Sequence, residues 1–236
     1  MVIKIRILGI DEAGRGAVLG PLVICGILIE ERNEKKLKKL NVKDSKLLKP
    51  KQRERLAPKI EEIATHSVVI RISPCKIDSN RRSGHNLNQL EALRMADIIN
   101  MTKPDKVIID SPDHNSHKFR DFLWSNLENK NIELVCENFA DQNYPIVSAA
   151  SIVAKVNRDN AIKELEQQLG EEIGIGYPHD QRTINFLKKI AEQNKGKMPS
   201  YVRTTWDTTI QIIEKYRQKT ILGFIESLIK KKKPCN

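Results

Sequence analysis

The N-terminal sequence VIKIRILGIDEAGRG (residues 2–16) joins an apolar run to an unusual charged segment. Val, Ile and Leu are interrupted by Lys4 and Arg6, a pattern typical of a β-strand with one partly exposed face. We expect this strand to end near Asp11, so that the acids and the Gly-Arg-Gly that follow leave the end of a sheet. The stretch therefore predicts both the first strand and one wall of a site.

Farther along the chain, two patterns of apolar spacing predict the remaining elements. Strand-like segments occur at residues 2–10, 18–29, 66–73, 106–110 and 132–137. Helical spacing occurs at residues 50–65, 87–101, 117–128, 145–170 and 182–195, with further helices to the end. The short link between the first two strands favours antiparallel pairing, and the later strand-helix-strand alternation favours parallel pairing. The sequence thus predicts an α/β fold, a mixed sheet flanked by helices.

Composition and charge indicate which classes of partner the protein can bind. The chain has 236 residues, enough for one large domain, and its net charge of +11 favours polyanionic partners such as nucleic acid. The alternative is a lysine-rich surface that serves only solubility. The longest uncharged apolar stretch, residues 17–29, is shorter than the roughly 20 residues needed to cross a bilayer, so no membrane association is expected. The 4 cysteines form no C-x-x-C pair, which favours a reduced, cytoplasmic setting.

Four acids occupy comparable places at strand ends. Asp11 ends the first strand, Asp110 ends KVIID, and Asp141 follows the strand at 132–137. Glu12 lies where the first strand is expected to break, so we expect it to turn toward the same pocket. Each acid alone is explained by ordinary turn chemistry. Together they form an oxygen-only ligand set, which suits Mg²⁺ or Mn²⁺ rather than zinc.

This combination of charges indicates phosphate chemistry. A basic protein attracts phosphates, clustered carboxylates repel them, and bridging cations resolve the conflict. Two such ions can promote phosphodiester hydrolysis. Gly14 and Gly16 would let the backbone approach a phosphate, and Arg15 between them adds a positive charge, although turn geometry alone also accounts for Gly-Arg-Gly. No P-loop or dinucleotide-binding fingerprint is present in the sequence.

The motifs, taken in order, resemble those of ribonuclease HII, especially its archaeal branch. The resemblance rests on GIDEAGRG (9–16), KDSK (43–46), IID ending at Asp110, ADQNYPIVSAASIVAK (140–155), GYPHDQRT (176–183) and VRTTWDT (202–208). It implies a ribonuclease H-like catalytic domain over residues 1–200. Residues 201–236 would form a C-terminal helical extension with a basic tail, packed on the same domain. The protein is expected to be a monomer.

The resemblance also implies an activity and its residues. The expected reaction is two-metal cleavage of RNA in RNA/DNA hybrids and at ribonucleotides embedded in duplex DNA, 5′ of the ribonucleotide, leaving a 3′-hydroxyl and a 5′-phosphate. The metal-binding, catalytic carboxylates would be Asp11, Glu12, Asp110 and Asp141. Recognition of the ribonucleotide would fall to Gly14, Arg15, Gly16 and Tyr177, and contacts to the nucleic-acid backbone to Lys46, Ser148, Ser151 and Lys155.

Two departures and two rival functions remain. Ala17 stands where archaeal members commonly have proline, and residues 137–141 read ENFAD where the family often has His-Lys before Ala-Asp. One rival is a catalytically silent protein that binds RNA/DNA hybrids, but the presence of all four acids argues against it. The other is a different nuclease of this fold, such as a Holliday-junction resolvase or a type 1 ribonuclease H. DEAGRG and Tyr177 argue against both of these nucleases.

Two further segments have a functional interpretation. Asp113, His114 and His117 are spaced like metal ligands, but residues that cap a helix explain them better. QKTILGFI (218–225) follows the spacing of a sliding-clamp-binding box through Gln218, Ile221 and Phe224, with Ile225 in place of a second aromatic residue. The alternative is an amphipathic helix that packs on its own domain.

Overall fold

A five-stranded mixed sheet forms the centre of the molecule. The computed structural model describes residues 4–42 and 48–231, with side chains as far as Thr220. The strands are β1 (Arg6–Ala13), β2 (Leu22–Glu30), β3 (His66–Ile72), β4 (Lys106–Asp110) and β5 (Glu133–Glu137). Their order is β3-β2-β1-β4-β5, antiparallel among β1, β2 and β3 and parallel among β1, β4 and β5. The predicted mixed α/β sheet is confirmed.

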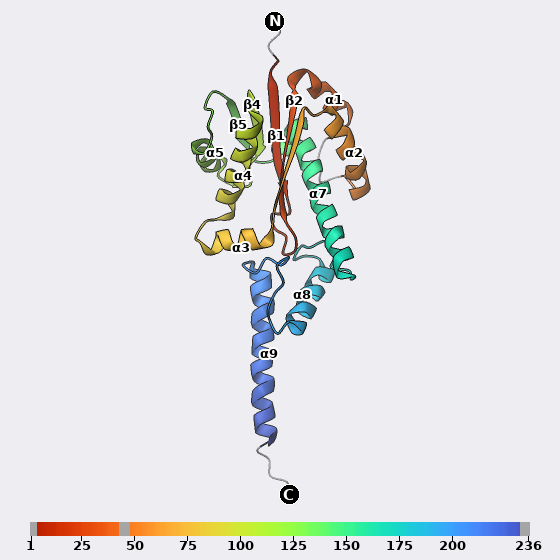
Figure 1. Ribbon diagram of the computed structural model, residues 1–236, viewed down its shortest axis with the longest axis vertical. Coiled ribbons are helices and arrows are strands. Elements are labelled where there is room, and N and C mark those ends of the chain that lie inside the picture. The colour runs from red at the N-terminus through yellow and green to blue at the C-terminus, as the bar shows by residue number, and fades with distance from the viewer. Residues whose placement is uncertain (1–3, 43–47, 232–236) are drawn as a thin grey trace.

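Helices cover both faces of this sheet (Figure 1). On one face lie α1 (Glu34–Lys39), α2 (Pro50–Ile63) and α7 (Pro145–Leu169). On the other lie α3 (Pro74–Arg82), α4 (Leu87–Thr102) and α5 (Ser116–Ser125). Strand β2 is buried on both sides because Val23, Cys25 and Ile27 face the α7 layer, while Leu22, Ile24 and Leu28 face the α4 layer. Two apolar cores therefore hold the sheet from opposite sides.

The sequence did not predict the short helices α1, α3 and α6 (Ala140–Asn143) or the 3₁₀ turn η1 (Glu31–Asn33). They are too short to display an apolar period. Helix α3, for example, is a polar segment whose start is set locally: Ser73 accepts a hydrogen bond from the Lys76 N–H at 3.4 Å, and Pro74 follows it.

Strand β1 continues two residues beyond its expected end at Asp11. Its antiparallel ladder with β2 pairs Glu12 with Ile24 and Ala13 with Val23. Successive residues of a strand point to opposite faces, so Asp11 and Glu12 are directed to different layers. The expectation that the chain breaks at Glu12 is wrong, because pairing with β2 keeps the backbone extended.

Helix α7 runs alongside β1 in the same direction (Figure 1). A Cβ atom added at Gly9 would lie 2.6 Å from the backbone carbon and oxygen of Ile146, so helix and strand touch backbone to backbone there. A Cβ atom at Gly14 would lie 3.2 Å from the Arg158 side chain. Residues 146–158 of the helix advance about 18 Å and residues 9–14 of the strand about 17 Å, so the two segments stay level. The DEAGRG and SAASIVAK motifs are thereby held side by side.

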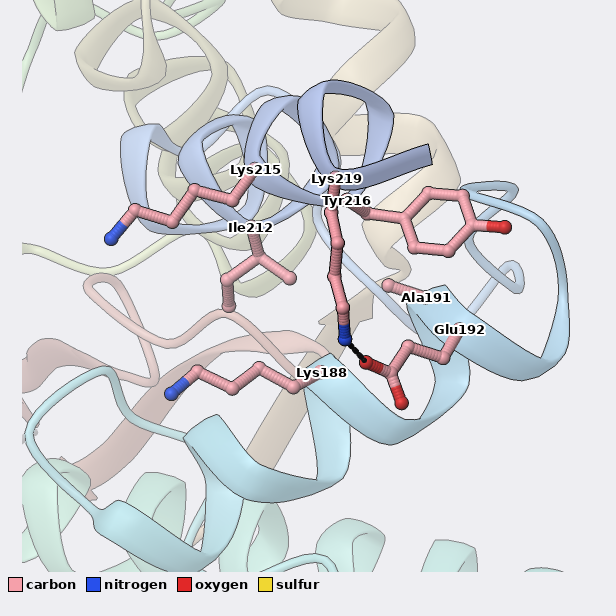
Figure 2. Close-up of a pocket in the computed structure, with 7 residues that line it drawn as sticks. All are labelled: Lys188, Ala191, Glu192, Ile212, Lys215, Tyr216 and Lys219. Carbon is pink, nitrogen blue, oxygen red and sulfur yellow. Dashed lines mark hydrogen bonds and ion pairs between the residues drawn. The ribbon is translucent and has the colours of Figure 1, made fainter. Parts of the chain in front are cut away.

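The C-terminal helices lie beyond one end of the sheet. Helix α9 (Asp207–Lys231) packs its first turns on α8 (Gln181–Gln193), and Figure 2 shows the contact, with Lys219 paired to Glu192 at 3.3 Å. A small pocket of about 160 Å³ lies between the two helices and is lined by residues of both. The rest of α9, as far as Lys231, extends away from the body of the molecule in Figure 1. Among the described helices, none has the length and apolar character to cross a membrane.

We predict that Gly9→Ala destabilises the protein by about 1–3 kcal/mol, because the added methyl group would overlap the backbone of α7. Chemical unfolding followed by circular dichroism measures this. Gly16→Ala is the matched control, since a Cβ atom there would meet nothing within 4 Å. Equal unfolding free energies for the two variants would contradict the proposed close approach.

Candidate active site

Three carboxylates meet where the parallel strands end. One oxygen atom from each of Asp11, Asp110 and Asp141 lies within 4.8 Å of the others. Asp11 and Asp110 are neighbours because the β1–β4 register pairs Ile10 with Ile109, one residue earlier on each strand. Asp141 comes from α6, whose first N–H, that of Ala140, donates to Asp110 Oδ1 at 3.0 Å. The prediction that these three acids converge is thus realised in the structure.

The electrostatics of this cluster favour a bound cation. Burial raises the pKa of Asp11 above its usual value, and the neighbouring Asp141 charge raises it further. The Lys155 ammonium and a hydrogen bond from Ser151 act in the opposite direction. Acids held this close, with oxygen as their only ligand atom, fit a hard divalent ion such as Mg²⁺ or Mn²⁺.

Glu12 does not join the group of three. It belongs to the opposite face of β1, paired in register with Ile24, and its carboxylate lies near Glu91. Burial raises the pKa of Glu12 well above its usual value, and the charges of Asp11 and Glu91 add to the effect, while Arg15 lowers it. Within the described part of the chain, Glu12 Oε2 has no hydrogen-bond partner. The expected four-acid cluster is therefore a three-acid cluster with a fourth acid beside it.

The Gly-Arg-Gly loop is fixed through the Arg15 side chain. Its guanidinium forms an ion pair with Glu91, which is fully buried in α4, and donates a second hydrogen bond to Asn88. Gly14 has a positive φ of 86°, which favours glycine. Among described residues, no backbone carbonyl accepts from the N–H of Arg15 or of Gly16. These two backbone N–H groups can therefore donate to an anion, whereas the Arg15 guanidinium already binds Glu91 and Asn88.

The polar residues predicted on α7 divide into two groups. Ser151 and Lys155 are hydrogen-bonded to each other and lie next to Asp11, at the acid cluster. Ser148 is buried and donates to the carbonyl of Val42. This contact ties α7 to the chain before residue 43, and the contact of Ser148 with a nucleic-acid backbone stays a prediction. Lys46 falls outside the described residues.

Tyr177 lies on a large groove beside the acids. The guanidinium carbon of Arg158 sits 4.4 Å from the centre of its ring, and the His179 ring is stacked at 5.5 Å. The groove has a volume of about 990 Å³, and Ala13 and Lys155 also line it. The N–H of Val18 donates to the Gly176 carbonyl at 2.8 Å, which joins the tyrosine loop to the Gly-Arg-Gly loop.

Sequence reasoning missed three charged residues that support the site. Glu91 forms an ion pair with Arg15, and the Arg158 guanidinium packs over the ring of Tyr177. Arg203 donates hydrogen bonds to the carbonyls of Arg15 and Gly20. A signal existed only for Glu91, which lies in line with Leu87 and Met95 at helical spacing. An acid inside an apolar stripe needs a partner, whereas nothing in the local sequence indicated the two arginines.

The segment ENFAD, which departs from the family pattern, holds the backbone after Asp110. The Asn138 amide donates to the carbonyls of Ser111 at 3.2 Å and Asp113 at 2.7 Å, and Phe139 has a φ of 62° with 61% of its surface exposed.

The histidine-rich loop is a helix cap, as expected. Asn115 accepts from the Lys118 N–H at 3.0 Å and so caps α5. Asp113 accepts from the Asn115 N–H, also at 3.0 Å. The described residues contain no metal-ligand grouping that includes His114 or His117.

Comparison with known proteins agrees with this geometry. The family model described as Ribonuclease HII matches residues 8–209. A ribonuclease HII of Methanococcus maripaludis is 41% identical, with 93% of this chain and 92% of that protein covered. The crystal structure of ribonuclease H2 from Pyrococcus horikoshii superposes with a TM-score of 0.82 and 41% identity, over 90% of this chain and 99% of that one.

A second solved structure, the complex of PCNA with ribonuclease HII from Archaeoglobus fulgidus, gives a TM-score of 0.77 at 38% identity, covering 86% of this chain and 96% of that one. Relatives of this similarity, matched over nearly their whole length, confirm the resemblance drawn from the motifs. The chain belongs to the ribonuclease HII family, endoribonucleases that act on RNA in RNA/DNA hybrids.

Proposed function

We propose that this protein, acting as a monomer in the cytoplasm, cleaves duplex DNA on the 5′ side of an embedded ribonucleotide as well as RNA in longer hybrids. The products are a 3′-hydroxyl and a 5′-phosphate. Asp11, Asp110 and Asp141 hold Mg²⁺ or Mn²⁺, and Glu12 acts beside them. The observation that carries the proposal is the convergence of three carboxylates within 4.8 Å.

The side chains around the acids prepare them for this chemistry. Two bound cations would lower the pKa of water and stabilise negative charge on the phosphate. Lys155 and Ser151 favour the ionised form of Asp11. The Ala140 N–H fixes the orientation of Asp110, and the half-buried Lys155 offers a positive charge to an approaching phosphate. The chain thus supplies both ligands and counter-charge.

Recognition of the ribonucleotide is assigned to the loop and the groove beside the acids. The N–H groups of Arg15 and Gly16 can donate to a phosphate or to a 2′-hydroxyl, the group that distinguishes RNA from DNA. Tyr177 lines the same groove as Lys155, and an aromatic ring there can stack on a sugar or base. A silent hybrid-binding protein would not need the acid cluster, so cleavage is the better proposal.

We predict that Asp110→Asn lowers cleavage of a duplex containing one ribonucleotide by at least about 100-fold, because it removes a ligand charge. The asparagine oxygen can still accept from the Ala140 N–H, so the fold should be kept. The assay uses a labelled duplex with Mg²⁺ or Mn²⁺, beside an all-DNA duplex and a long RNA/DNA hybrid. Asp121→Asn is the control and should stay fully active, because the Asp121 side chain is 69% exposed on α5.

The outcomes of this assay separate the parts of the proposal. If only the long hybrid is cut, the metal site stands but the assignment of the loop and Tyr177 fails. If no substrate is cut with either ion, the silent hybrid-binding protein becomes the better explanation. Full activity of the Asp110→Asn variant would refute the proposed metal site itself.

We also predict that Mg²⁺ stabilises the protein more at pH 8 than at pH 5.5. The pKa of Asp11 is raised, so the metal-free folded protein keeps a proton there to a higher pH, and the ion must displace it. Metal binding therefore weakens as pH falls. At 100 times its dissociation constant, one ion adds about 2.7 kcal/mol, visible as a rise in Tm. An equal increase in Tm on adding Mg²⁺ at both pH values would contradict this prediction. So would an increase in Tm of the Asp110→Asn variant as large as that of the wild-type protein.

We further propose that α9 binds a sliding clamp through Gln218, Ile221 and Phe224. The Archaeoglobus relative forms a complex with PCNA, and Gln218 is exposed on the part of α9 that leaves the body of the molecule. The side chains of Ile221 and Phe224 lie outside the described residues.

Replacing Gln218 and Phe224 together by alanine should weaken binding to an archaeal clamp at least about tenfold, since such segments bind through a few anchors. Calorimetry measures the affinity. Glu214→Gln, an exposed change on the same helix, should bind normally. Unchanged affinity of the double variant would favour a helix that serves only its own domain.

A further inference from the structure

Arg203 is fully buried, although its side chain is charged. Its guanidinium donates to the carbonyl of Arg15 at 2.8 Å and, through Nε and Nη2, to the carbonyl of Gly20 at 3.2 Å. These carbonyls mark the two ends of the loop at residues 15–20, which contains the end of the Gly-Arg-Gly motif. One side chain therefore spans the base of the proposed recognition loop.

The surroundings of Arg203 are unfavourable for a charge. Burial and the nearby Arg158 lower its pKa to about 9. The hydrogen-bond acceptors in contact with it are backbone carbonyls rather than a carboxylate, and the Trp206 ring lies 5.0 Å from its guanidinium carbon. An apolar side chain would fill this space at lower electrostatic cost, so the guanidinium is there for its donors.

The segment that carries Arg203 is anchored independently of the loop. The hydroxyl and N–H groups of Thr204 and Thr205 all donate to the two oxygens of Asp78 in α3, at distances of 2.7 to 3.2 Å. The backbone N–H of Arg203 binds the loop itself, donating to the Val18 carbonyl at 2.9 Å. The arginine thus extends from a fixed platform toward the loop.

We infer that Arg203 is a positioning residue that holds the loop at residues 15–20 in the conformation that recognises a ribonucleotide–DNA junction. Arg15 is then fixed at both ends, by Glu91 at its guanidinium and by Arg203 at its carbonyl. Its N–H and that of Gly16 keep one direction toward the substrate. The inference rests on the proposed function of this loop and adds the residue on which its discrimination depends.

The fork of an arginine is required because two carbonyls must be bound together. A lysine has one ammonium group on a flexible stem and cannot reproduce the paired geometry. Cleavage within a long hybrid offers many equivalent sites, whereas a single junction must be met by a correctly placed loop. Loss of Arg203 should therefore affect the junction substrate more than the hybrid.

The test compares Arg203→Lys and Arg203→Met with the wild-type protein. For each, kcat/KM is measured on a duplex with one ribonucleotide and on a long hybrid, together with Tm. We expect kcat/KM on the single-ribonucleotide duplex, divided by kcat/KM on the long hybrid, to fall by about 10- to 100-fold in both variants. Small displacements of positioning groups have effects of this size. Arg82→Met is the matched control, since Arg82 is exposed and donates to Thr204 without reaching the loop.

Hydrogen exchange provides a readout that does not depend on activity. In Arg203→Lys the peptide covering residues 14–20 should exchange faster, while β2 keeps its wild-type rate. Unchanged exchange in that peptide would overturn the positioning role. If the peptide exchanges faster but the ratio of the two kcat/KM values is unchanged, the link between Arg203 and discrimination is overturned. Equal losses of kcat/KM on both substrates, in proportion to the fraction of protein that is unfolded, would overturn it as well.

The same experiment distinguishes failure of the proposed function. A wild-type protein that leaves the single-ribonucleotide duplex uncut would refute junction recognition, and with it the discrimination assigned to Arg203. The exchange rates would still decide whether Arg203 holds the loop.

Discussion

The close approach of α7 to β1 at Gly9 is the constraint on which the site depends. Any side chain there would meet the backbone of Ile146, and the helix would have to move outward. Because helix and strand run level with each other, that contact also sets the distance between Asp11 and the pair Ser151 and Lys155. A glycine without a functional side chain thus determines the electrostatic environment of Asp11.

Charge compensation then explains the arrangement around the acids. Burial of Asp11 beside Asp141 is unfavourable, and Lys155 offsets it only in part, since the pKa of Asp11 remains raised. A divalent ion would remove the remaining repulsion. On the opposite face of β1, the positive charge of Arg15 lowers the pKa of Glu12 and Glu91, as Lys155 does for Asp11. The two faces of β1 therefore each bear an acid whose charge is offset in part by one basic side chain, Lys155 for Asp11 and Arg15 for Glu12.

The sequence predicted what depends on local pattern and on strand ends. Asp11, Asp110 and Asp141 could be brought together because parallel strands end at one edge of a sheet. The end of β1 was predicted two residues too early because the length of this strand depends on its ladder with β2, which no local signal reveals. The contact of Ser148 with Val42 could not be predicted, because helical spacing gives a face of α7 but not what covers it. The contacts of Arg203 join residues 183 to 188 positions apart, beyond the reach of any sequence period.

These long-range contacts bear on where the catalytic unit ends. A boundary after residue 200 would separate the loop at residues 15–20 from the segment at 201–206 that binds it. That segment bonds to Arg15, Val18 and Gly20 on one side and to Asp78 on the other. The family match, which continues to residue 209, includes all of it. We therefore propose that the division lies after residue 206, where α9 begins, so that Arg203 belongs to the same unit as the loop at residues 15–20.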